Sequence, residues 1–184
     1  DLIILPGSKN TRDDLAWFKE QGWDKLVQRH LRLGGKIMGI CGGYQMLGNW
    51  VHDPEGSESK PGSCQGLGLL DIETTLEGEK QLRNVHGNWI GLHTQDTHAA
   101  VSGYEIHVGT TAGPDTQRAL VSLQDSSGDD TATGIRNDGA RNHDNTVMGS
   151  YVHGILDESS LLDSILTWAG LEDIQAFDYQ AHRA

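Results

Sequence analysis

Ile37-Met38-Gly39-Ile40-Cys41-Gly42-Gly43-Tyr44 is a short apolar run followed by a cysteine, with Gly39 two residues before the cysteine and Gly42-Gly43 directly after it. A continuous apolar run of this length, bounded by turn residues, is typical of a strand buried in a parallel sheet. Gly34-Gly35 precedes the run and would end a helix there, while Gly42 to Gly48 begins a further helical segment. The pattern predicts a helix, a buried strand, a sharp turn and another helix, which is the alternation of an α/β fold.

The residues before this unit repeat the alternation. Leu2 to Leu5 is another apolar run and stops at Pro6-Gly7, as a buried strand does at a turn. From Thr11 to Leu33 apolar residues recur at helical spacing with an interruption near Gly22, so one or two helices should connect the two strands. We therefore expect one domain over residues 1–184, with a mostly parallel central sheet flanked by helices.

The remainder of the chain is less regular. The segment from His52 to Ser63 is rich in proline, glycine and charge, which predicts a surface loop. Ser159 to Ala169 carries an apolar stripe at helical spacing, which predicts a final helix. Four further runs predict strands, at Leu69–Thr75, Gly103–Val108, Leu120–Leu123 and Val147–Val152.

Composition excludes several classes of protein. The chain has 14 basic and 26 acidic residues, a net charge of -12 and no cluster of lysine or arginine, so no nucleic-acid partner is expected. No apolar stretch reaches the roughly 18 residues that cross a bilayer, and the first residues lack the layout of a signal peptide. Cys41 and Cys64 stand in unlike contexts, which argues against a disulfide. These features predict a soluble, cytoplasmic protein with no membrane partner.

Cys41 is the candidate nucleophile. It follows an apolar strand, and the glycines on both sides permit the sharp strand-to-helix turn of a nucleophile elbow. The N-terminus of the following helix favours the thiolate, the reactive form of cysteine. A buried and inert cysteine would not require such neighbours. Cys64 lacks this setting, and we expect it to be a structural or surface thiol.

A thiolate nucleophile needs a partner that transfers protons, and His153 is the best candidate among the nine histidines. It directly follows the predicted strand Val147–Val152. The other histidines are dispersed, and their spacing fits no metal motif. We predict no metal site and interpret them as surface or hydrogen-bonded residues.

Four blocks of sequence, taken together and in this order, carry a resemblance to a known family. They are Leu5-Pro6-Gly7-Ser8, Gly39 to Gly48, Gly103-Tyr104-Glu105-Ile106-His107, and Gly149-Ser150-Tyr151-Val152-His153-Gly154. Through them the chain resembles class I (triad-type) glutamine amidotransferases from Leu2 to about Gly170, which implies a flavodoxin-like α/β fold. More narrowly, Pro6-Gly7-Ser8-Lys9-Asn10-Thr11 and the third block resemble the C-terminal glutaminase domain of cobyric acid synthases, enzymes of cobalamin biosynthesis.

The resemblance implies a role for each matching residue. Cys41 would attack the side-chain amide of glutamine, and His153 would transfer the protons. The backbone N–H groups of Gly7 and Gly42 would form the oxyanion hole, which glycine suits because it permits close approach. Gln45 matches a family glutamine that helps to hold the substrate.

Tyr104, Glu105 and His107 are placed near the glutamine pocket by the resemblance, whereas the residues alone also fit a strand with alternating faces. One position departs from the wider family. Most members carry a glutamate two residues after the catalytic histidine, which orients the ring, and that place is Ile155 here. Cobyric acid synthases share the departure. Glu105 and Asp157 are the candidates for the third member of the triad.

The sequence begins at Asp1, beside a predicted core strand and without a start methionine. We expect it to be the C-terminal piece of a longer protein. The resemblance implies an ATP-dependent synthetase domain before Asp1, with ATP and magnesium, that uses ammonia to amidate a corrinoid bound mainly elsewhere. No phosphate-binding loop motif occurs in this chain, so no cofactor is expected in it.

Three alternatives remain open. The acceptor could be that of a related ligase such as cobyrinic acid a,c-diamide synthase. A cysteine peptidase or hydrolase of similar architecture would also use an elbow cysteine and a histidine, although Gln45 and the paired glycines favour free glutamine. The absent glutamate would also fit a degenerate domain that only binds a partner.

Overall fold

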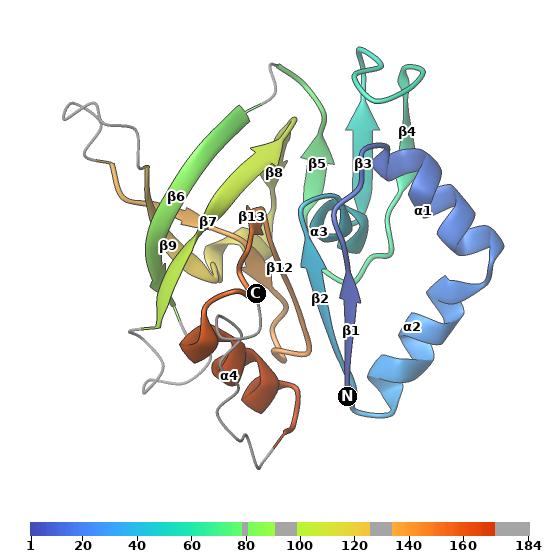
Figure 1. Cartoon of the computed structure of the whole chain (residues 1–184). Helices are drawn as coiled ribbons and strands as arrows, with labels where there is room; N and C mark the ends of the chain where they lie inside the picture. The colour runs from blue at the N-terminus through green and yellow to red at the C-terminus, as the bar shows by residue number, and fades with distance from the viewer. Residues whose placement is uncertain (79–80, 91–98, 126–133, 172–184) are drawn as a thin grey trace, which may run out of the picture.

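The computed structural model describes residues 1–78, 81–90, 99–125 and 134–171. This part of the chain forms three sheets, four α-helices and one short 3-10 helix, η1 (Pro114–Gln117). Figure 1 shows a sheet at the centre, with two helices on one side and a strongly curved sheet on the other. None of the described helices is long and apolar enough to cross a membrane.

The central sheet has the strand order β1 (Leu2–Leu5), β2 (Lys36–Ile40), β12 (Val147–Ser150) and β11 (Ala140–Arg141). β1, β2 and β12 are parallel, and β11 is antiparallel to β12. The helices α1 (Thr11–Glu20) and α2 (Trp23–Arg32) connect β1 to β2, and α3 (Gly42–Leu47) follows β2 directly. The carboxyl ends of β1 and β2 therefore meet beside the first turn of α3.

β2 is buried on both faces, which explains its continuous apolar sequence. Successive side chains of a strand point to opposite faces. Ile37 lies in a buried cluster with Val27 of α2, whereas Met38 lies in a second cluster with Leu161 of α4 (Ser159–Trp168). Each large apolar side chain buried in this way contributes about 1.5–3 kcal/mol. The two clusters pack against opposite faces of β2 and so hold in place the strand that leads to Cys41.

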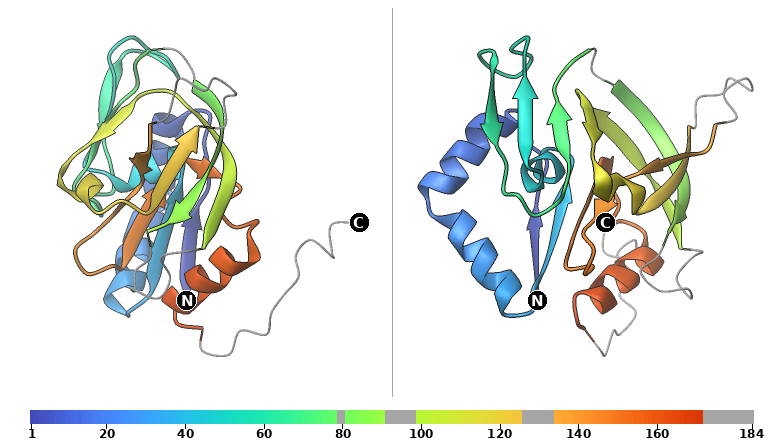
Figure 2. Two further views of the ribbon diagram at one scale, coloured as in Figure 1. Left: turned by 90° about the vertical axis from the view of Figure 1, so that its left-hand side faces the viewer. Right: turned by 180° about the vertical axis from the view of Figure 1, so that it is seen from behind.

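The curved sheet has the order β10 (Arg136–Asp138), β9 (Val121–Asp125), β6 (Gln81–Trp89), β7 (Ala100–His107) and β13 (Val152–His153). All of its pairings are antiparallel. Only Tyr151 separates β12 from β13, so the chain passes from the central sheet to the curved sheet within one residue. His153, the last residue of β13, is thus carried at the junction of the two sheets. In the right-hand view of Figure 2, the curved sheet and the two N-terminal helices again lie on opposite sides of the central sheet.

A third sheet has the order β4 (Gly62–Gln65), β3 (Trp50–Asp53), β5 (Glu73–Thr75) and β8 (Thr110–Ala112). β3 and β5 are parallel, and the other pairings are antiparallel. The connection between β3 and β4 reaches the start of α1, where Thr11 N donates a hydrogen bond to Glu58 Oε2 at 2.6 Å. This contact brings the connection to the same end of the central sheet as Cys41.

The predicted α/β fold is confirmed, and so is the break between the first two helices at Gly22, whose φ is 73°. The prediction of a mostly parallel central sheet flanked by helices was too simple. Parallel pairing is confined to β1, β2 and β12 and to β3 with β5, and most pairings in the described ranges are antiparallel. A sheet, and not only helices, covers one face of the central sheet because β13 continues directly from β12 (Figure 1).

Several segments differ from the sequence-based expectation, among them the short strands β8, β10 and β11, which were not predicted. Only Glu73–Thr75 of the predicted strand Leu69–Thr75 is a strand, because the N–H groups of Leu69 and Leu70 are bonded to Leu47 O at the end of α3. Both ends of the predicted loop His52–Ser63 belong to the antiparallel pair β3 and β4. β6 was not predicted, since few of its side chains are buried and its pairing with both neighbours defines it.

Candidate active site

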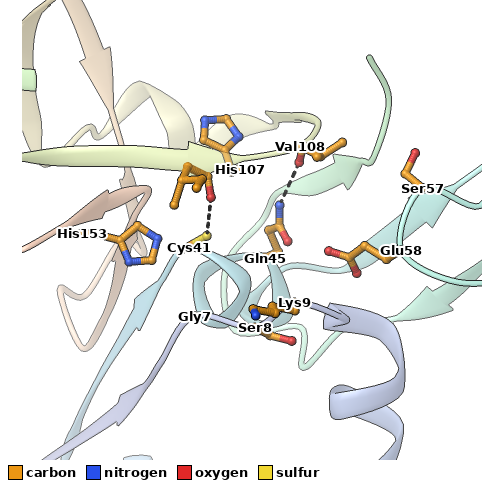
Figure 3. Close-up of a pocket in the computed structure, with 11 residues that line it drawn as sticks. Gly7, Ser8, Lys9, Cys41, Gln45, Ser57, Glu58, His107, Val108 and His153 are labelled. Carbon is orange, nitrogen blue, oxygen red and sulfur yellow. Dashed lines mark hydrogen bonds between the residues drawn. The ribbon is translucent and has the colours of Figure 1, made fainter. Parts of the chain in front are cut away.

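A pocket of about 680 Å³ opens at the carboxyl ends of β1 and β2 (Figure 3). Its walls come from five parts of the chain. They are the loop after β1 (Gly7, Ser8, Lys9), the β2–α3 turn (Cys41, Gln45), the β3–β4 connection (Ser57, Glu58), the end of β7 (Ile106, His107, Val108) and His153. Convergence of polar groups from separate elements on one pocket is the usual arrangement of a binding or active site.

Cys41 occupies a strained turn between β2 and α3. Its φ is 53° and its ψ is -113°, a conformation that residues with a side chain rarely adopt. The backbone is held there because Cys41 N donates to Ser150 O at 2.9 Å and Cys41 O accepts from Gln45 N at 3.1 Å. Such a strand-to-helix turn is the geometry of a nucleophile elbow.

The paired glycines after Cys41 are needed because the loop after β1 passes very close to them. A Cβ added to Gly42 would lie 2.7 Å from Ser8 N, and one added to Gly43 would lie 2.1 Å from Leu5 O. Neither position has room for a larger residue. The close approach packs the start of α3 against the loop that carries Gly7.

His153 lies beside Cys41 in the same pocket (Figure 3). A Cβ placed on Gly7 would be 3.1 Å from His153 Cε1 and 3.7 Å from Cys41 Cβ, so both side chains meet over Gly7. Burial lowers the pKa of His153, which keeps the ring neutral and able to accept a proton near pH 7. His153 Nε2 is buried and has no hydrogen-bond partner within the described ranges.

Gly7 and Gly42, the predicted oxyanion donors, both lie next to the cysteine. Gly7 lines the pocket, and Gly42 is the residue after Cys41 at the start of α3. The role of their backbone N–H groups as oxyanion donors stays a prediction.

Gln45 is buried, and its amide is held by three residues from separate parts of the chain. Gln45 Oε1 accepts from Thr11 Oγ1 at 3.0 Å, while Nε2 donates to Val108 O at 3.3 Å and to Tyr151 Oη at 3.2 Å. Because Gln45 also lines the pocket, this network gives it a fixed position beside any ligand. The prediction that it helps to hold glutamine fits this placement.

The Gly103–His107 block divides between the two faces of β7. Tyr104 pairs with His153 in register and stacks on its ring, whereas Glu105 pairs with Val152. His107 lines the pocket and stacks on Tyr151 with 3.8 Å between centroids. The pattern-based interpretation of alternating faces therefore describes the block well.

Glu105 lies away from the pocket. Its side chain is 3% exposed, and both carboxylate oxygens accept hydrogen bonds from the Arg136 guanidinium. In an antiparallel pair the side chains of opposite residues share a face, so Glu105 shares the face of Val152 and not that of His153. The structure thus argues against Glu105 as a glutamine ligand or as the third triad member.

Asp157, the other candidate for that place, lies in the turn after His153. Its N–H donates to Gly154 O at 2.8 Å, and its Oδ2 would be 3.6 Å from a Cβ on Gly154. Asp157 therefore lies close to Gly154, the residue after His153, and its role as the third triad member stays a prediction.

Ser57, Glu58 and Lys9 line the pocket but were not predicted as site residues. The β3–β4 connection that carries Glu58 looks like an ordinary surface loop in sequence. Its shape depends on Asp53, which is fully buried and accepts from Ser57 N at 2.6 Å and from Glu58 N at 3.2 Å. The sequence carries no local signal for this arrangement, because the burial of Asp53 and its bonds to the connection are visible only in the structure.

No group of three or more His, Cys, Asp or Glu residues in the described ranges could hold a metal ion. Cys41 and Cys64 are not joined in a disulfide.

Comparison with known proteins agrees with this geometry. The CobB/CobQ-like glutamine amidotransferase domain matches residues 1–161. A crystal structure of a glutamine amidotransferase has a TM-score of 0.52 at 19% identity, over 92% of this chain and 79% of that chain. The structure of PurLQS from Thermotoga maritima has a TM-score of 0.56 at 19% identity, over 91% of this chain and 79% of that chain. At this identity the two structures show the shared fold, and the match to the family domain shows that the chain belongs to the CobB/CobQ-like glutamine amidotransferases, whose substrate is glutamine.

Proposed function

We propose that this chain is the glutaminase domain of a cobyric acid synthase, and that it hydrolyses glutamine through a cysteinyl thioester. The observation that carries the chemistry is the meeting of Cys41, in its elbow conformation, with the buried imidazole of His153 over Gly7.

The reaction follows from the positions of these groups. His153 accepts the Cys41 proton, and the thiolate attacks the amide carbon of glutamine. Negative charge develops on the amide oxygen beside the N–H groups of Gly7 and Gly42, each of which is worth about 3 kcal/mol as an oxyanion donor. His153 returns the proton to the departing nitrogen, which leaves as ammonia. Water then attacks the thioester, releases glutamate and restores the thiol.

The charged residues of the pocket support a free amino acid as substrate. Lys9 and Glu58 both line it, and Figure 3 shows Glu58 approaching from the side opposite His153. A carboxylate and an ammonium group suit the α-ammonium and α-carboxylate of free glutamine. A peptide substrate has neither charge at that position, which disfavours a peptidase.

The wider proposal concerns the rest of the protein. We propose that residues 1–184 form one domain, that ammonia passes from it to a synthetase domain before Asp1, and that this partner uses ATP and magnesium to amidate a corrinoid. The narrower resemblance of Pro6–Thr11 and Gly103–His107 supports cobyric acid synthase over a related ligase. No cofactor is required in the chain, and the cytoplasm is the proposed location.

The test is covalent labelling with 6-diazo-5-oxo-L-norleucine, a reactive glutamine analogue, followed by mapping of the adduct by mass spectrometry. We expect one adduct, on Cys41, that is suppressed by excess glutamine and absent in Cys41→Ala. His153→Ala should slow labelling by about 100-fold or more, since it removes the group that transfers protons. A folded chain that is not labelled, alone or joined to its synthetase domain, would refute the proposal. Amidation assays on the joined protein, with cobyric acid synthase and a,c-diamide synthase substrates in parallel, identify the acceptor.

A further inference from the structure

The glutamate that orients the histidine in the usual triad is missing from its place after His153. The position that carries the orienting glutamate in most relatives is Ile155, which is fully buried in the core beside α4. The Glu105 carboxylate is directed to Arg136 on the other face of β7. Burial lowers the pKa of His153, the opposite of what an adjacent carboxylate would do.

Tyr104 is in direct contact with the ring instead. The two rings are stacked, with 4.9 Å between their centroids and 5° between their planes. Tyr104 and His153 are register partners in the antiparallel pair of β7 and β13, so their side chains lie on one face. The strand pairing sets the stack, and the stack does not depend on a flexible loop.

The backbone at Gly103 fixes the distance between these strands. A Cβ on Gly103 would lie 2.1 Å from His153 O, so β7 can approach β13 only because this residue is glycine. Gly7 also lies next to the imidazole, since a Cβ added to it would be 3.1 Å from His153 Cε1. The ring is therefore stacked on Tyr104 and leaves no room for a side chain at Gly7.

We infer that Tyr104 is a positioning residue that fixes the plane of the His153 ring, a task that the glutamate at the position of Ile155 performs in most relatives. This inference rests on the proposed glutaminase function. An aromatic face restricts rotation of the imidazole without accepting a hydrogen bond from it. Tyr104 itself does not line the pocket, so it acts on the reaction through His153 and not through glutamine.

The experiment compares Tyr104→Phe and Tyr104→Leu by the kinetics of Cys41 labelling with 6-diazo-5-oxo-L-norleucine. The maximal labelling rate reports on proton transfer and attack, and the half-saturating concentration reports on binding. Loss of ring alignment typically costs on the order of 10- to 100-fold in rate. For Tyr104→Leu we expect such a loss in the maximal labelling rate, with a half-saturating concentration that changes less than about threefold. For Tyr104→Phe, which keeps the aromatic ring, we expect a maximal rate within about threefold of the native value.

Trp50→Leu is the matched control. Trp50 is 41% exposed, close to the 43% of Tyr104, and its ring also stacks on a histidine, His52, with 5.9 Å between centroids. Neither residue of that pair lines the pocket. The control should label at the native rate.

Several results would overturn the inference. They are a native rate in Tyr104→Leu, a rise confined to half-saturation, or an equal loss in Tyr104→Phe and Tyr104→Leu. If Tyr104→Leu does not fold, Tyr104→Thr, with a residue that suits a strand, gives the same comparison. Failure of the native chain to label at all would instead refute the proposed function, and the inference with it.

Discussion

Ser150 Oγ donates a hydrogen bond to Asp138 Oδ2 over 2.5 Å where β12 ends and the chain turns toward His153. Tyr151 N donates to the same carboxylate oxygen at 3.0 Å. Ser150 is fully buried and Asp138 is nearly so. The carboxylate therefore holds the one-residue junction between the central and curved sheets, and through it the strand that carries His153.

This junction should make stability depend on pH in the weakly acidic range. Burial raises the pKa of Asp138 from 3.8 to about 6. The folded chain then binds a proton more tightly than the unfolded chain, so this group's stabilising contribution is complete below about pH 4 and is lost as the pH rises through about 6. Asp138→Asn does not titrate. Between pH 4 and 6.5 we expect the free energy of unfolding of the native chain to fall by up to about 3 kcal/mol relative to this variant.

Urea denaturation at a series of pH values measures this difference. Asp144→Asn, at an exposed position in the turn before β12, is the control and should give a curve parallel to that of the native chain. Parallel curves for Asp138→Asn as well would show that Asp138 does not titrate in this window.

The elbow should tolerate no side chain at Gly43. The added Cβ of Gly43→Ala would lie 2.1 Å from Leu5 O, a backbone atom that cannot move aside. We expect a loss of about 3 kcal/mol in the free energy of unfolding and loss of Cys41 labelling. Gly134→Ala is the control, since nothing lies within 4 Å of its added Cβ. Equal stability of the two variants would mean that the contact between the β1 loop and α3 is not tight.

The elbow could be predicted from sequence because its signals are local. An apolar run, a cysteine and paired glycines describe a strand and a turn without knowledge of distant residues, and Cys41, Gly42 and Gln45 lie within that unit. His153 was found because it directly follows the predicted strand Val147–Val152. These residues do converge in space.

The rest required long-range pairing. Tyr104 and Glu105 point to opposite faces of β7. Which of them lies beside His153 follows from the register of β7 with β13, which no local pattern specifies. β6 has few buried side chains and forms because strands from later in the chain pair with it. Glu58 enters the pocket because Thr11 and Asp53 hold its connection, and each of these contacts crosses a turn or a gap in sequence.

Gln45 should contribute mainly to substrate binding. Its amide is fixed by Thr11, Val108 and Tyr151, so Gln45→Ala removes a pre-positioned polar group from the pocket wall. We expect KM for glutamine to rise about tenfold or more with a smaller change in kcat. Tyr151→Phe, which removes one of the three bonds, should raise KM less.

Steady-state glutaminase assays well below the melting temperature separate these effects from instability. Gln124→Ala, at an exposed position on β9, serves as the control. A fall in kcat at constant KM would assign Gln45 to the chemical step instead.

Glu58 should select substrates that carry an α-ammonium group. Its carboxylate lines the pocket and accepts hydrogen bonds from Thr11 N at 2.6 Å and Thr11 Oγ1 at 3.1 Å, which hold it in place. A hydrogen bond to a charged group is worth about 1.5–3 kcal/mol, so Glu58→Gln should raise KM for glutamine by about 10-fold or more. KM for glutaramate, which has the same amide but no amino group, should not change.

The same residue predicts how binding varies with pH. Burial raises the pKa of Glu58 above its ordinary value, so the carboxylate becomes protonated, and stops attracting the ammonium group, at a higher pH than an exposed glutamate would. As the pH falls, KM for glutamine should therefore rise in the native chain and in Glu55→Gln, an exposed control in the same connection, but not in Glu58→Gln. If KM for glutaramate rises with it in the native chain, the titrating group does not recognise the amino group, and the assignment of Glu58 is wrong.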